Sequence, residues 1–292
     1  MIKILIGGSP CTFWSIAQKN NRETEAEGIG WELFKNYLIA REKFKPDFFL
    51  YENNKSAAQP IKDQISKELG VELMHINSAL VSAQNRERFY AFNWQVDRPK
   101  DRRVTLADVL EEDVEPVILH NLYGGFRETR PRVFYDKAPT IRANSGGGTI
   151  PSALLKGYSV PDDIVSARAV SRKLTVRECE RLQTMPEGYC RAVSNTQALR
   201  GLGNGWTAEV IIHILAGALK NVPKDEEIVV LSMYDGIGTG RYCLDKMGFK
   251  NVRYFAYEID KYAKAIAMSN YPDIVQMGDA FDVRHPDWTI GY

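Results

Sequence analysis

The chain has 292 residues, 44% of them hydrophobic, which is enough for one large or two modest domains with a substantial core. Its formal net charge of +1 excludes an overall positive field that would attract nucleic acid, so any such binding must depend on local basic patches. The four cysteines have neither zinc-site spacing nor the density of a disulfide scaffold, and no apolar stretch is as long as a membrane span, so we expect a cytoplasmic protein without a membrane anchor.

The first part of the chain, residues 1–93, alternates predicted strands with a predicted helix. Apolar runs at Ile2–Ile6, Asp47–Glu52 and Glu72–Asn77 indicate strands, and apolar residues recur at helical spacing over Gly30–Phe44. This alternation is typical of an α/β domain.

Polar residues capable of chemistry accompany each of these predicted strands. The segment Gly7-Gly8-Ser9-Pro10-Cys11-Thr12 follows the first strand, Tyr51-Glu52-Asn53 ends the second, and Gln84-Asn85-Arg86-Glu87-Arg88 comes after the third. A single cysteine after a strand usually packs as a small hydrophobic residue. A cysteine accompanied by a carboxylate, an amide and two arginines is instead a candidate nucleophile.

The middle section, residues 94–171, is predicted to be a smaller, loop-rich domain with an acidic stretch at Asp108–Glu115 and a glycine-rich stretch at residues 144–149. Its arginines are candidates for nucleic-acid contacts, because arginine binds guanine and phosphate equally well: Arg127, Arg130, Arg132 and Arg142. A second basic cluster follows near the domain junction, where we expect it to serve phosphates in part and helix ends in part: Arg168, Arg172, Lys173, Arg177 and Arg181.

Helical spacing returns in residues 172–221, at Leu174–Thr184 and Trp206–Leu219, and we expect these helices to return to the first domain. The polar stretch Lys220–Glu227 is predicted to be a linker. Residues 222–292 then alternate again, with strands at Ile228–Ser232 and Val252–Glu258, helices at Arg241–Met247 and Lys261–Ser269, and a third strand that ends at Gly278-Asp279.

A glycine-rich turn, Tyr234-Asp235-Gly236-Ile237-Gly238-Thr239-Gly240, follows the first strand of that last section. Glycines let the backbone approach a ligand at a strand-to-helix turn, and Glu258 ends the next strand roughly 20 residues later, where a Rossmann-type fold holds ribose hydroxyls. Because the spacing is not the full dinucleotide fingerprint, it favours a nucleoside cofactor without a pyrophosphate. The alternative is that the glycines only form a tight turn and that Glu258 caps a helix.

In combination, these motifs resemble those of the DNA cytosine-5 methyltransferases, and the resemblance extends over most of the chain outside the middle section. Pro10-Cys11 is similar to that family's catalytic dipeptide, Glu52-Asn53 to its Glu-Asn motif, and Gln84-x-Arg86-x-Arg88 to its Gln-x-Arg-x-Arg motif. The turn at Asp235 to Gly240 is similar to the cofactor motif, and its details are closest to the de novo branch and to phage and bacterial relatives.

The order of the motifs differs from the family's usual order. Leu174 to Gln183 is similar to the segment that orients the recognition domain, and Gly203-Asn204-Gly205-Trp206 resembles the final motif, yet the glycine turn follows the cysteine instead of preceding it. The resemblance therefore implies a circularly permuted chain whose ends lie close together. The implied fold is a Rossmann-like S-adenosylmethionine-dependent methyltransferase fold, a mixed and mostly parallel sheet with helices on both faces, with a small target recognition region at residues 94–171.

The resemblance also implies roles for single residues. Cys11 would add to carbon-6 of cytosine, and positive charge from Arg86 or Arg88 would favour its thiolate. Glu52 would hold or protonate ring nitrogen 3, and Asn53 would position Glu52 or the loop backbone. S-adenosylmethionine, released as S-adenosylhomocysteine, would be bound by nine residues: Tyr234, Asp235, Gly236, Gly238, Glu258, Ile259, Asp279, Asn204 and Trp206.

The implied partner is duplex DNA, from which the target base must be extruded. The loop from Trp14 to Arg22 is polar enough to close over DNA, with Ser15, Gln18 and Arg22 as contacts, and the alternative is a solvated surface loop. The chemistry requires no metal, and a cognate restriction nuclease is a further candidate partner. Two other functions stay open at this point, an RNA cytosine-5 methyltransferase and a catalytically silent DNA-binding protein on the same fold.

Overall fold

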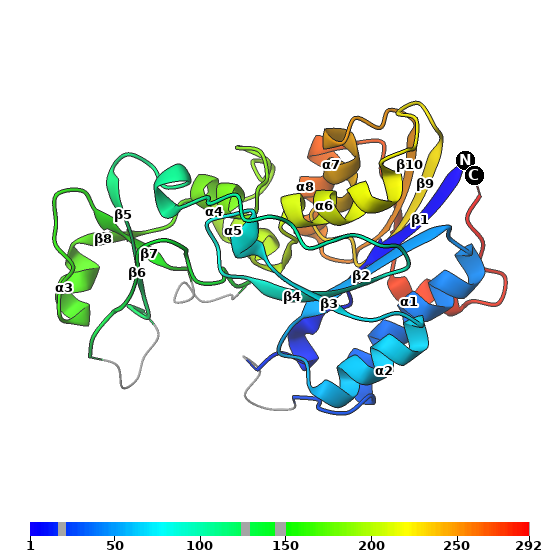
Figure 1. The fold of residues 1–292 in the computed structure, drawn as a ribbon, viewed down its shortest axis with the longest axis horizontal. Helices are drawn as coiled ribbons and strands as arrows, with labels where there is room; N and C mark the ends of the chain where they lie inside the picture. Colours follow the sequence, from blue (N-terminus) through cyan, green and yellow to red (C-terminus); the bar gives the residue numbers. More distant parts are fainter. Residues whose placement is uncertain (17–21, 124–128, 144–149, 292) are drawn as a thin grey trace. The chain divides into compact units, whose positions relative to one another are not determined.

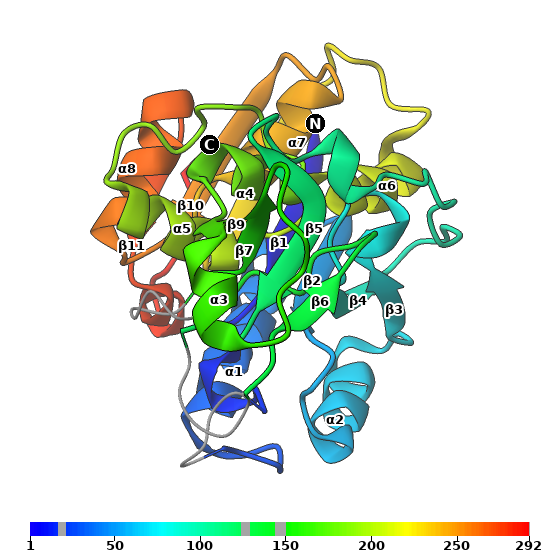
Figure 2. The same cartoon turned by 90° about the vertical axis from the view of Figure 1, so that its left-hand side faces the viewer.

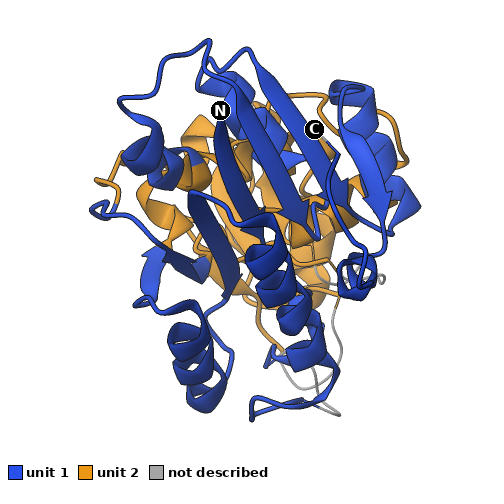
Figure 3. Cartoon of the chain, turned by 90° about the vertical axis from the view of Figure 1, so that its right-hand side faces the viewer, with its two compact units in different colours: residues 1–76, 87–98, 212–292 blue, residues 77–86, 99–211 orange. Residues whose placement is uncertain are grey.

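The computed structural model describes residues 1–16, 22–123, 129–143 and 150–291. The chain forms two compact units, which Figure 3 shows in different colours. Unit 1 contains residues 1–76, 87–98 and 212–292, and unit 2 contains residues 77–86 and 99–211. Within the described ranges, no helix is both long and apolar enough to cross a membrane.

Unit 1 is built on a seven-stranded sheet with the order β11-β10-β9-β1-β2-β4-β3. β9 pairs in parallel with β1, from Ile2 opposite Ile228 to Gly7 opposite Met233, although the two strands come from distant parts of the chain. β2 and β4 are antiparallel, so the sheet is mixed and mostly parallel. The strands are β1 (Ile2–Gly7), β2 (Phe48–Asn54), β3 (Met74–Asn77), β4 (Glu87–Phe92), β9 (Ile228–Met233), β10 (Val252–Tyr257) and β11 (Val275–Gly278).

Helices cover both faces of this sheet, α1 and α2 on one side and α6, α7 and α8 on the other (Figure 1). The helices are α1 (Gly28–Phe44), α2 (Gln59–Leu69), α6 (Ala208–Leu219), α7 (Thr239–Lys246) and α8 (Lys261–Asn270), with short 3-10 turns η1 (Cys11–Phe13) and η4 (Ala280–Arg284). On the α1 side, Phe34 and Tyr51 are fully buried, and their rings meet edge-on with centroids 5.0 Å apart. Burial of a side chain such as Phe34 contributes roughly 1.5–3 kcal/mol. The predicted fold class is confirmed.

The sequence patterns do not predict α2 or β4. β4 begins at Glu87, inside the polar motif, and its last four residues, Phe89–Phe92, are all buried, so no alternation marks the strand. α2 is short and mostly polar, and it buries Ile61, Ile65 and Leu69 at intervals of one helical turn. Both elements are stabilised by burial of their apolar residues against neighbouring strands and helices, which a local sequence pattern does not reveal.

The predicted linker connects α6 to β9 and runs beside the first strand. The backbone N–H of Ile2 donates to the carbonyl of Glu227 at 2.8 Å, and the N-terminal ammonium pairs with Glu226. A short polar connection therefore joins α6 to β9 and brings the cofactor half of the sequence next to β1.

Unit 2 contains a four-stranded antiparallel sheet with the order β6-β5-β7-β8 (Figure 2). Its small core includes Leu119, Leu122, Leu154 and Ala167. The elements of this unit are β5 (Val114–His120), β6 (Arg132–Phe134), β7 (Ser152–Leu155), β8 (Ser171–Lys173), α3 (Ile164–Ala169), α4 (Val176–Leu182), α5 (Asn195–Asn204), η2 (Ser78–Leu80) and η3 (Leu106–Asp108).

The bounds of unit 2 differ from those of the predicted middle section. Residues 172–211 belong to unit 2 by their contacts, whereas the sequence analysis assigns them to helices that return to the first domain. The physical reason is the fully buried carboxylate of Glu178 on α4, which accepts hydrogen bonds from Arg172 on β8 and from the backbone N–H of Glu111. These bonds tie α4 to the sheet that precedes it.

Candidate active site

The candidate nucleophile and acid lie at the carboxyl ends of two adjacent parallel strands. β1 ends at Gly7, which pairs with Tyr51 of β2, so the loop that contains Cys11 begins at the same end of the sheet as Glu52, the next residue of β2. In open α/β sheets, this edge is where ligands bind.

Cys11 opens the 3-10 turn η1, and its carbonyl accepts the backbone N–H groups of Trp14 at 3.1 Å and Ser15 at 3.0 Å. Its side chain is partly exposed, whereas the other three cysteines of the chain are buried. Burial raises the pKa of Cys190 to about 12 and holds the pKa of Cys179 above its ordinary range. Cys11 is therefore the accessible thiol.

Glu52 forms an ion pair with Arg88 of β4, with 3.1 Å between Oε1 and Nε, and both side chains are largely enclosed. Arg88 pairs with Asn54 across the two strands, which puts it diagonally beside Glu52 on the same face of the sheet. The backbone of Gly8 packs against the acid, since a Cβ there would lie 3.0 Å from Glu52 Oε2. Glu52 is thus fixed between the cysteine loop and β4.

Asn53 hydrogen-bonds to the backbone of the loop that contains Cys11, and positioning that backbone is one of the two roles that the sequence leaves open. Its amide Nδ2 donates to the carbonyl of Ser9 at 3.0 Å and to the hydroxyl of Tyr51 at 3.0 Å. That hydroxyl also bonds to Ser9 Oγ at 2.7 Å, and all three residues are buried. Sequence reasoning misses Ser9 and Tyr51, although both lie within the quoted motif segments.

The two arginines of one motif have different surroundings. Arg86 belongs to unit 2, is 3% exposed, and donates to the carbonyls of Ile141 and Gly203 at 3.0 Å and of Gly205 at 2.8 Å. Gln84 lies nearby and accepts the backbone N–H of Ile141. Arg86 joins separate segments of unit 2, whereas Arg88 pairs with the acid in unit 1.

The glycine turn has open backbone and an unpaired carboxylate oxygen. Gly236 has φ 64°, a left-handed conformation that favours glycine, and no described atom lies within 4 Å of the position of a Cβ. Asp235 accepts the hydroxyls of Ser232 at 2.7 Å and Tyr254 at 2.6 Å on Oδ1, while its buried Oδ2 has no partner among the described residues. Burial raises the pKa of Asp235 to about 6.

Tyr234, which begins this turn, is also left-handed, with φ 61°. It is held against α1, because its hydroxyl donates to the carbonyl of Leu33 at 2.7 Å and accepts the amide of Asn36 at 3.2 Å. Strained backbone of this kind is concentrated at functional sites.

The acids predicted for the cofactor lie on the next two strand ends. Glu258 Oε2 accepts the N–H of Gly236 at 2.8 Å, and its Oε1 accepts the N–H groups of Ile259 and Asp260. Ile259 is 72% exposed, and the exposed Asp279 caps η4 through the N–H of Phe281 at 2.9 Å. The remaining predicted contacts, Asn204 and Trp206, belong to unit 2.

The described ends of the loop after Cys11, residues 12–16 and Arg22, are held by contacts that the sequence does not predict. Trp14 is fully buried, and Arg22 donates to the carbonyl of Ser56 at 2.6 Å and to the carbonyl of Trp14 at 3.4 Å. The indole of Trp14 packs in the core of unit 1, so Trp14 itself offers no polar surface, and closing of the loop over DNA stays a prediction. Ser15 is partly exposed, and Gln18 lies outside the described residues.

Three predicted DNA-contacting arginines, Arg130, Arg132 and Arg142, are exposed in unit 2, and Arg127 lies outside the described residues. In the second basic cluster, three of the five members form ion pairs with acidic side chains: Arg172, Arg177 and Arg181. Arg172 pairs with Glu111, Asp113 and Glu178. Arg177 pairs with Glu111 and Glu187, and Arg181 pairs with Glu187. The acidic stretch thus faces the basic cluster.

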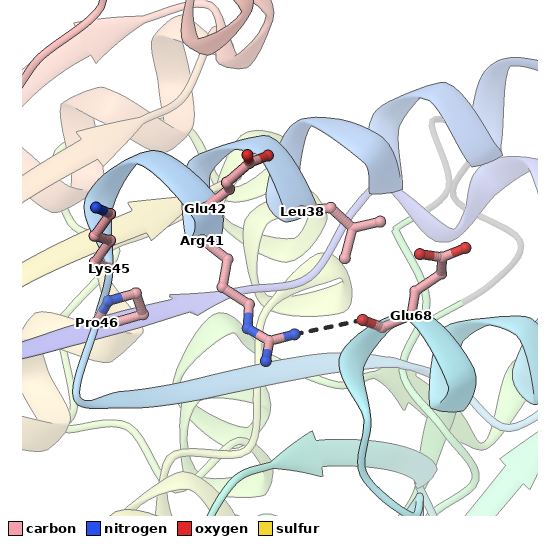
Figure 4. A pocket seen from close by; sticks show the side chains of 6 residues that line it. All are labelled: Leu38, Arg41, Glu42, Lys45, Pro46 and Glu68. Carbon is pink, nitrogen blue, oxygen red and sulfur yellow. Dashed lines mark hydrogen bonds between the residues drawn. The ribbon is translucent and has the colours of Figure 1, made fainter.

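A surface pocket in unit 1 lies beside the C-terminal end of α1 and the connection to β2 (Figure 4). Arg41 crosses it and donates to the carbonyls of Glu68 and Leu69. Because it is at the amino end of β2, it is not part of the candidate active site. Its lining residues are Leu38, Arg41, Glu42, Lys45, Pro46 and Glu68.

Comparison with known proteins adds independent findings. The model of the C-5 cytosine-specific DNA methylase family matches residues 1–121 and 127–220. The chain is 27% identical over 256 residues to the Type II methyltransferase M1.ScrFI of Lactococcus lactis subsp. cremoris, covering 75% of this chain and 62% of that protein. It is 26% identical over 246 residues to the Type II methyltransferase M.SsoII of Shigella sonnei, covering 72% and 62% respectively. The chain thus spans 62% of the length of each of these two relatives.

Among solved structures, the methyltransferase EhMeth of Entamoeba histolytica has a TM-score of 0.52 and 11% identity, covering 75% of this chain and 78% of that chain. This is a likeness of fold alone. The family match ends within the predicted linker, before the glycine turn, which agrees with a permuted motif order. Because the match runs over most of the chain, from the strand that leads to Cys11 to the end of α6, this chain belongs to the C-5 cytosine-specific DNA methylase family.

Proposed function

We propose that this protein transfers the methyl group of S-adenosylmethionine to carbon-5 of a cytosine extruded from duplex DNA. The observation that carries the proposal is the convergence, at one edge of the sheet, of the accessible thiol of Cys11 with the Glu52–Arg88 pair. Carbon-5 of cytosine is too weakly nucleophilic to accept a methyl group unaided. A nucleophile and a fixed acid at neighbouring strand ends are the groups that would activate it.

In the proposed reaction, Cys11 Sγ forms a bond to carbon-6 while the electrons of the carbon-5–carbon-6 double bond shift toward carbon-4 and ring nitrogen 3. Glu52 gives a proton to that nitrogen, and Arg88 stabilises the carboxylate that remains, at 3.1 Å. After carbon-5 has accepted the methyl group, it loses its proton to water. The carbon-5–carbon-6 double bond then re-forms, the Cys11 thiolate leaves, and ring nitrogen 3 returns its proton to Glu52.

S-adenosylmethionine, when bound, supplies an electrophilic methyl group attached to a sulfonium sulfur. The glycine turn fits such a group, because the space beside Gly236 is open and Asp235 offers an unpaired buried oxygen. Glu258 Oε2 accepts one backbone N–H and keeps a lone pair for a ribose hydroxyl. Ile259 offers an exposed apolar surface to the adenine, and Asp279 would accept its amino group.

The DNA substrate is supported by the family match and by the exposed arginines of unit 2, Arg130, Arg132 and Arg142. Guanidinium groups bind phosphate and guanine edges, so these residues are suited to a duplex. Extrusion of the target base costs a few kcal/mol, which contacts to the flanking DNA must offset.

The test is transfer of labelled methyl from S-adenosylmethionine to duplex DNA of mixed sequence and, in parallel, to transfer RNA. The intact protein is compared with Cys11→Ser and with a matched control, Cys179→Ala, which removes a buried thiol from α4. We expect 5-methylcytosine in DNA from the intact protein and the control, and none from Cys11→Ser. Methylation of transfer RNA alone, or methylation of DNA that survives in Cys11→Ser, would contradict the proposal.

A further inference from the structure

We propose that Glu23 is a positioning residue for the Cys11 thiol and that it acts through the indole of Trp14. The inference rests on the proposed function, in which Cys11 is the nucleophile, and it concerns a residue outside every motif quoted above. All of the groups involved belong to unit 1.

The carboxylate of Glu23 joins Trp14 to the start of α1. Its Oε2 accepts the indole Nε1–H of Trp14 at 3.0 Å, and both oxygens accept the backbone N–H of Gly30 at 3.1 Å. Gly30 lies in the first turn of α1, where N–H groups have no partner within the helix and the helix dipole favours an anion. The residue before the helix, Glu27, makes no side-chain capping bond, so Glu23 supplies the anion from outside.

Two glycines make room for this carboxylate. A Cβ on Gly30 would lie 2.5 Å from both Glu23 Oε2 and Trp14 Nε1, and a Cβ on Gly28 would lie 2.5 Å from Glu23 Oε1. Side chains at these positions would therefore displace the carboxylate or the indole. The glycines at positions 28 and 30 are therefore explained by the space that the Glu23 carboxylate occupies, without any ligand.

The indole in turn fixes the turn that begins at Cys11. Trp14 is fully buried in the main core of unit 1, and its backbone N–H donates to the Cys11 carbonyl at 3.1 Å. The backbone N–H of Glu23 donates to the carbonyl of Phe13 at 2.9 Å, which adds a second connection to the same turn. Because Cys11 is separated from Trp14 by only two residues, a displacement of the indole moves the thiol.

The experiment compares Glu23→Ala, Glu23→Gln, Trp14→Phe and the double variant Glu23→Ala/Trp14→Phe with a control. The control is Glu25→Ala, which removes an exposed carboxylate two residues away. Trp14→Phe keeps a buried aromatic ring but removes the indole N–H together with one of the two fused rings, and Glu23→Gln keeps the shape and one acceptor. Three quantities are measured at a temperature where all variants are folded. They are the single-turnover rate of methyl transfer to duplex DNA, the Kd for S-adenosylmethionine, and the rate at which iodoacetamide alkylates Cys11 without DNA.

We expect Glu23→Ala to slow methyl transfer by about 10-fold to 100-fold, the range expected for a misplaced reacting group, while the Kd for S-adenosylmethionine stays within about 2-fold. Alkylation of Cys11 becomes faster, because the Trp14 indole no longer holds the 3-10 turn η1 in one position. Glu23→Gln recovers part of the rate, and Glu23→Ala has a smaller effect in the Trp14→Phe background, since the two residues act through one contact.

Equal behaviour of Glu23→Ala and Glu25→Ala in both methyl transfer and alkylation would overturn the inference, as would additive effects of the Glu23 and Trp14 substitutions. If the intact protein methylates no DNA, the proposed function fails. The alkylation rate still decides whether Glu23 fixes Cys11, so the two failures are distinguishable.

Discussion

Truncation of the two arginines in Gln84-x-Arg86-x-Arg88 is expected to damage different properties of the protein. Arg86→Ala removes three hydrogen bonds to backbone carbonyls inside unit 2. Arg88→Ala removes the partner of Glu52 in unit 1. The first change should mainly lower the free energy of unfolding, and the second should mainly lower the rate of methyl transfer.

The magnitudes follow from burial and bond count. Each buried carbonyl left without a donor costs roughly 1–3 kcal/mol, but the three losses are not additive, because they share one cavity that water can enter. We therefore expect Arg86→Ala to lower the free energy of unfolding by about 3–4 kcal/mol. Arg88 is 16% exposed and Glu52 12%, so Arg88→Ala removes one donor from a largely enclosed carboxylate, which costs roughly 1–3 kcal/mol and is thus less than the loss expected for Arg86→Ala.

Urea unfolding followed by circular dichroism measures the stability of each variant, and single-turnover methyl transfer measures its activity. Because the chain has two units, unfolding is also followed by proteolysis to detect separate loss of unit 2. Arg102→Ala is the control, since its ion pair with Glu209 in unit 2 is exposed. Equal destabilisation by Arg86→Ala and Arg88→Ala, or a stable but inactive Arg86→Ala, would refute the reasoning.

Three further predictions concern the site. Tyr51→Phe removes the hydroxyl that binds Ser9 Oγ and should cost about 1–2 kcal/mol of stability in urea unfolding; it should also slow single-turnover methyl transfer, and an unchanged rate would separate Tyr51 from the loop. Glu52→Gln should lower the rate on the order of 10²-fold to 10⁴-fold without changing the Kd for S-adenosylmethionine by calorimetry, and a normal rate would remove Glu52 from the mechanism. Burial raises the pKa of Asp235 to about 6, so folding favours the protonated carboxyl. The stabilisation that results is fully present below the pKa of the unfolded chain and is lost as the pH rises through about 6. The unfolding free energy of the intact protein minus that of Asp235→Asn should therefore fall between about pH 4 and pH 7 in urea titrations, and a constant difference would contradict the burial argument.

The strand ends that hold Cys11, Glu52 and the glycine turn could be predicted because each motif directly follows a local apolar run. In a mostly parallel sheet, such strand ends gather at one edge. The surroundings of these residues could not be predicted in the same way. Trp14 precedes a polar stretch of sequence, and its burial depends on packing in the core of unit 1 and on its hydrogen bond to Glu23.

The pairing of charged side chains in unit 2 could not be predicted from the sequence either. The acidic stretch and the basic cluster are far apart in sequence, and only the antiparallel sheet of unit 2 brings Asp113 to Arg172. Arg86 and Arg88 are two residues apart and would share a face within one strand, but β4 begins at Glu87, so Arg86 is free to take another direction. Element boundaries therefore decide which members of a motif meet.

The most direct test of the central claim is to trap the covalent adduct. Duplex DNA containing 5-fluorocytosine is incubated with S-adenosylmethionine and the intact protein, because fluorine at carbon-5 blocks the elimination that would release the thiol. We expect a complex that survives denaturing electrophoresis, whose linked peptide contains Cys11, and which is absent for Cys11→Ser. A linkage to another residue, or an equal yield of complex from Cys11→Ser, would contradict it.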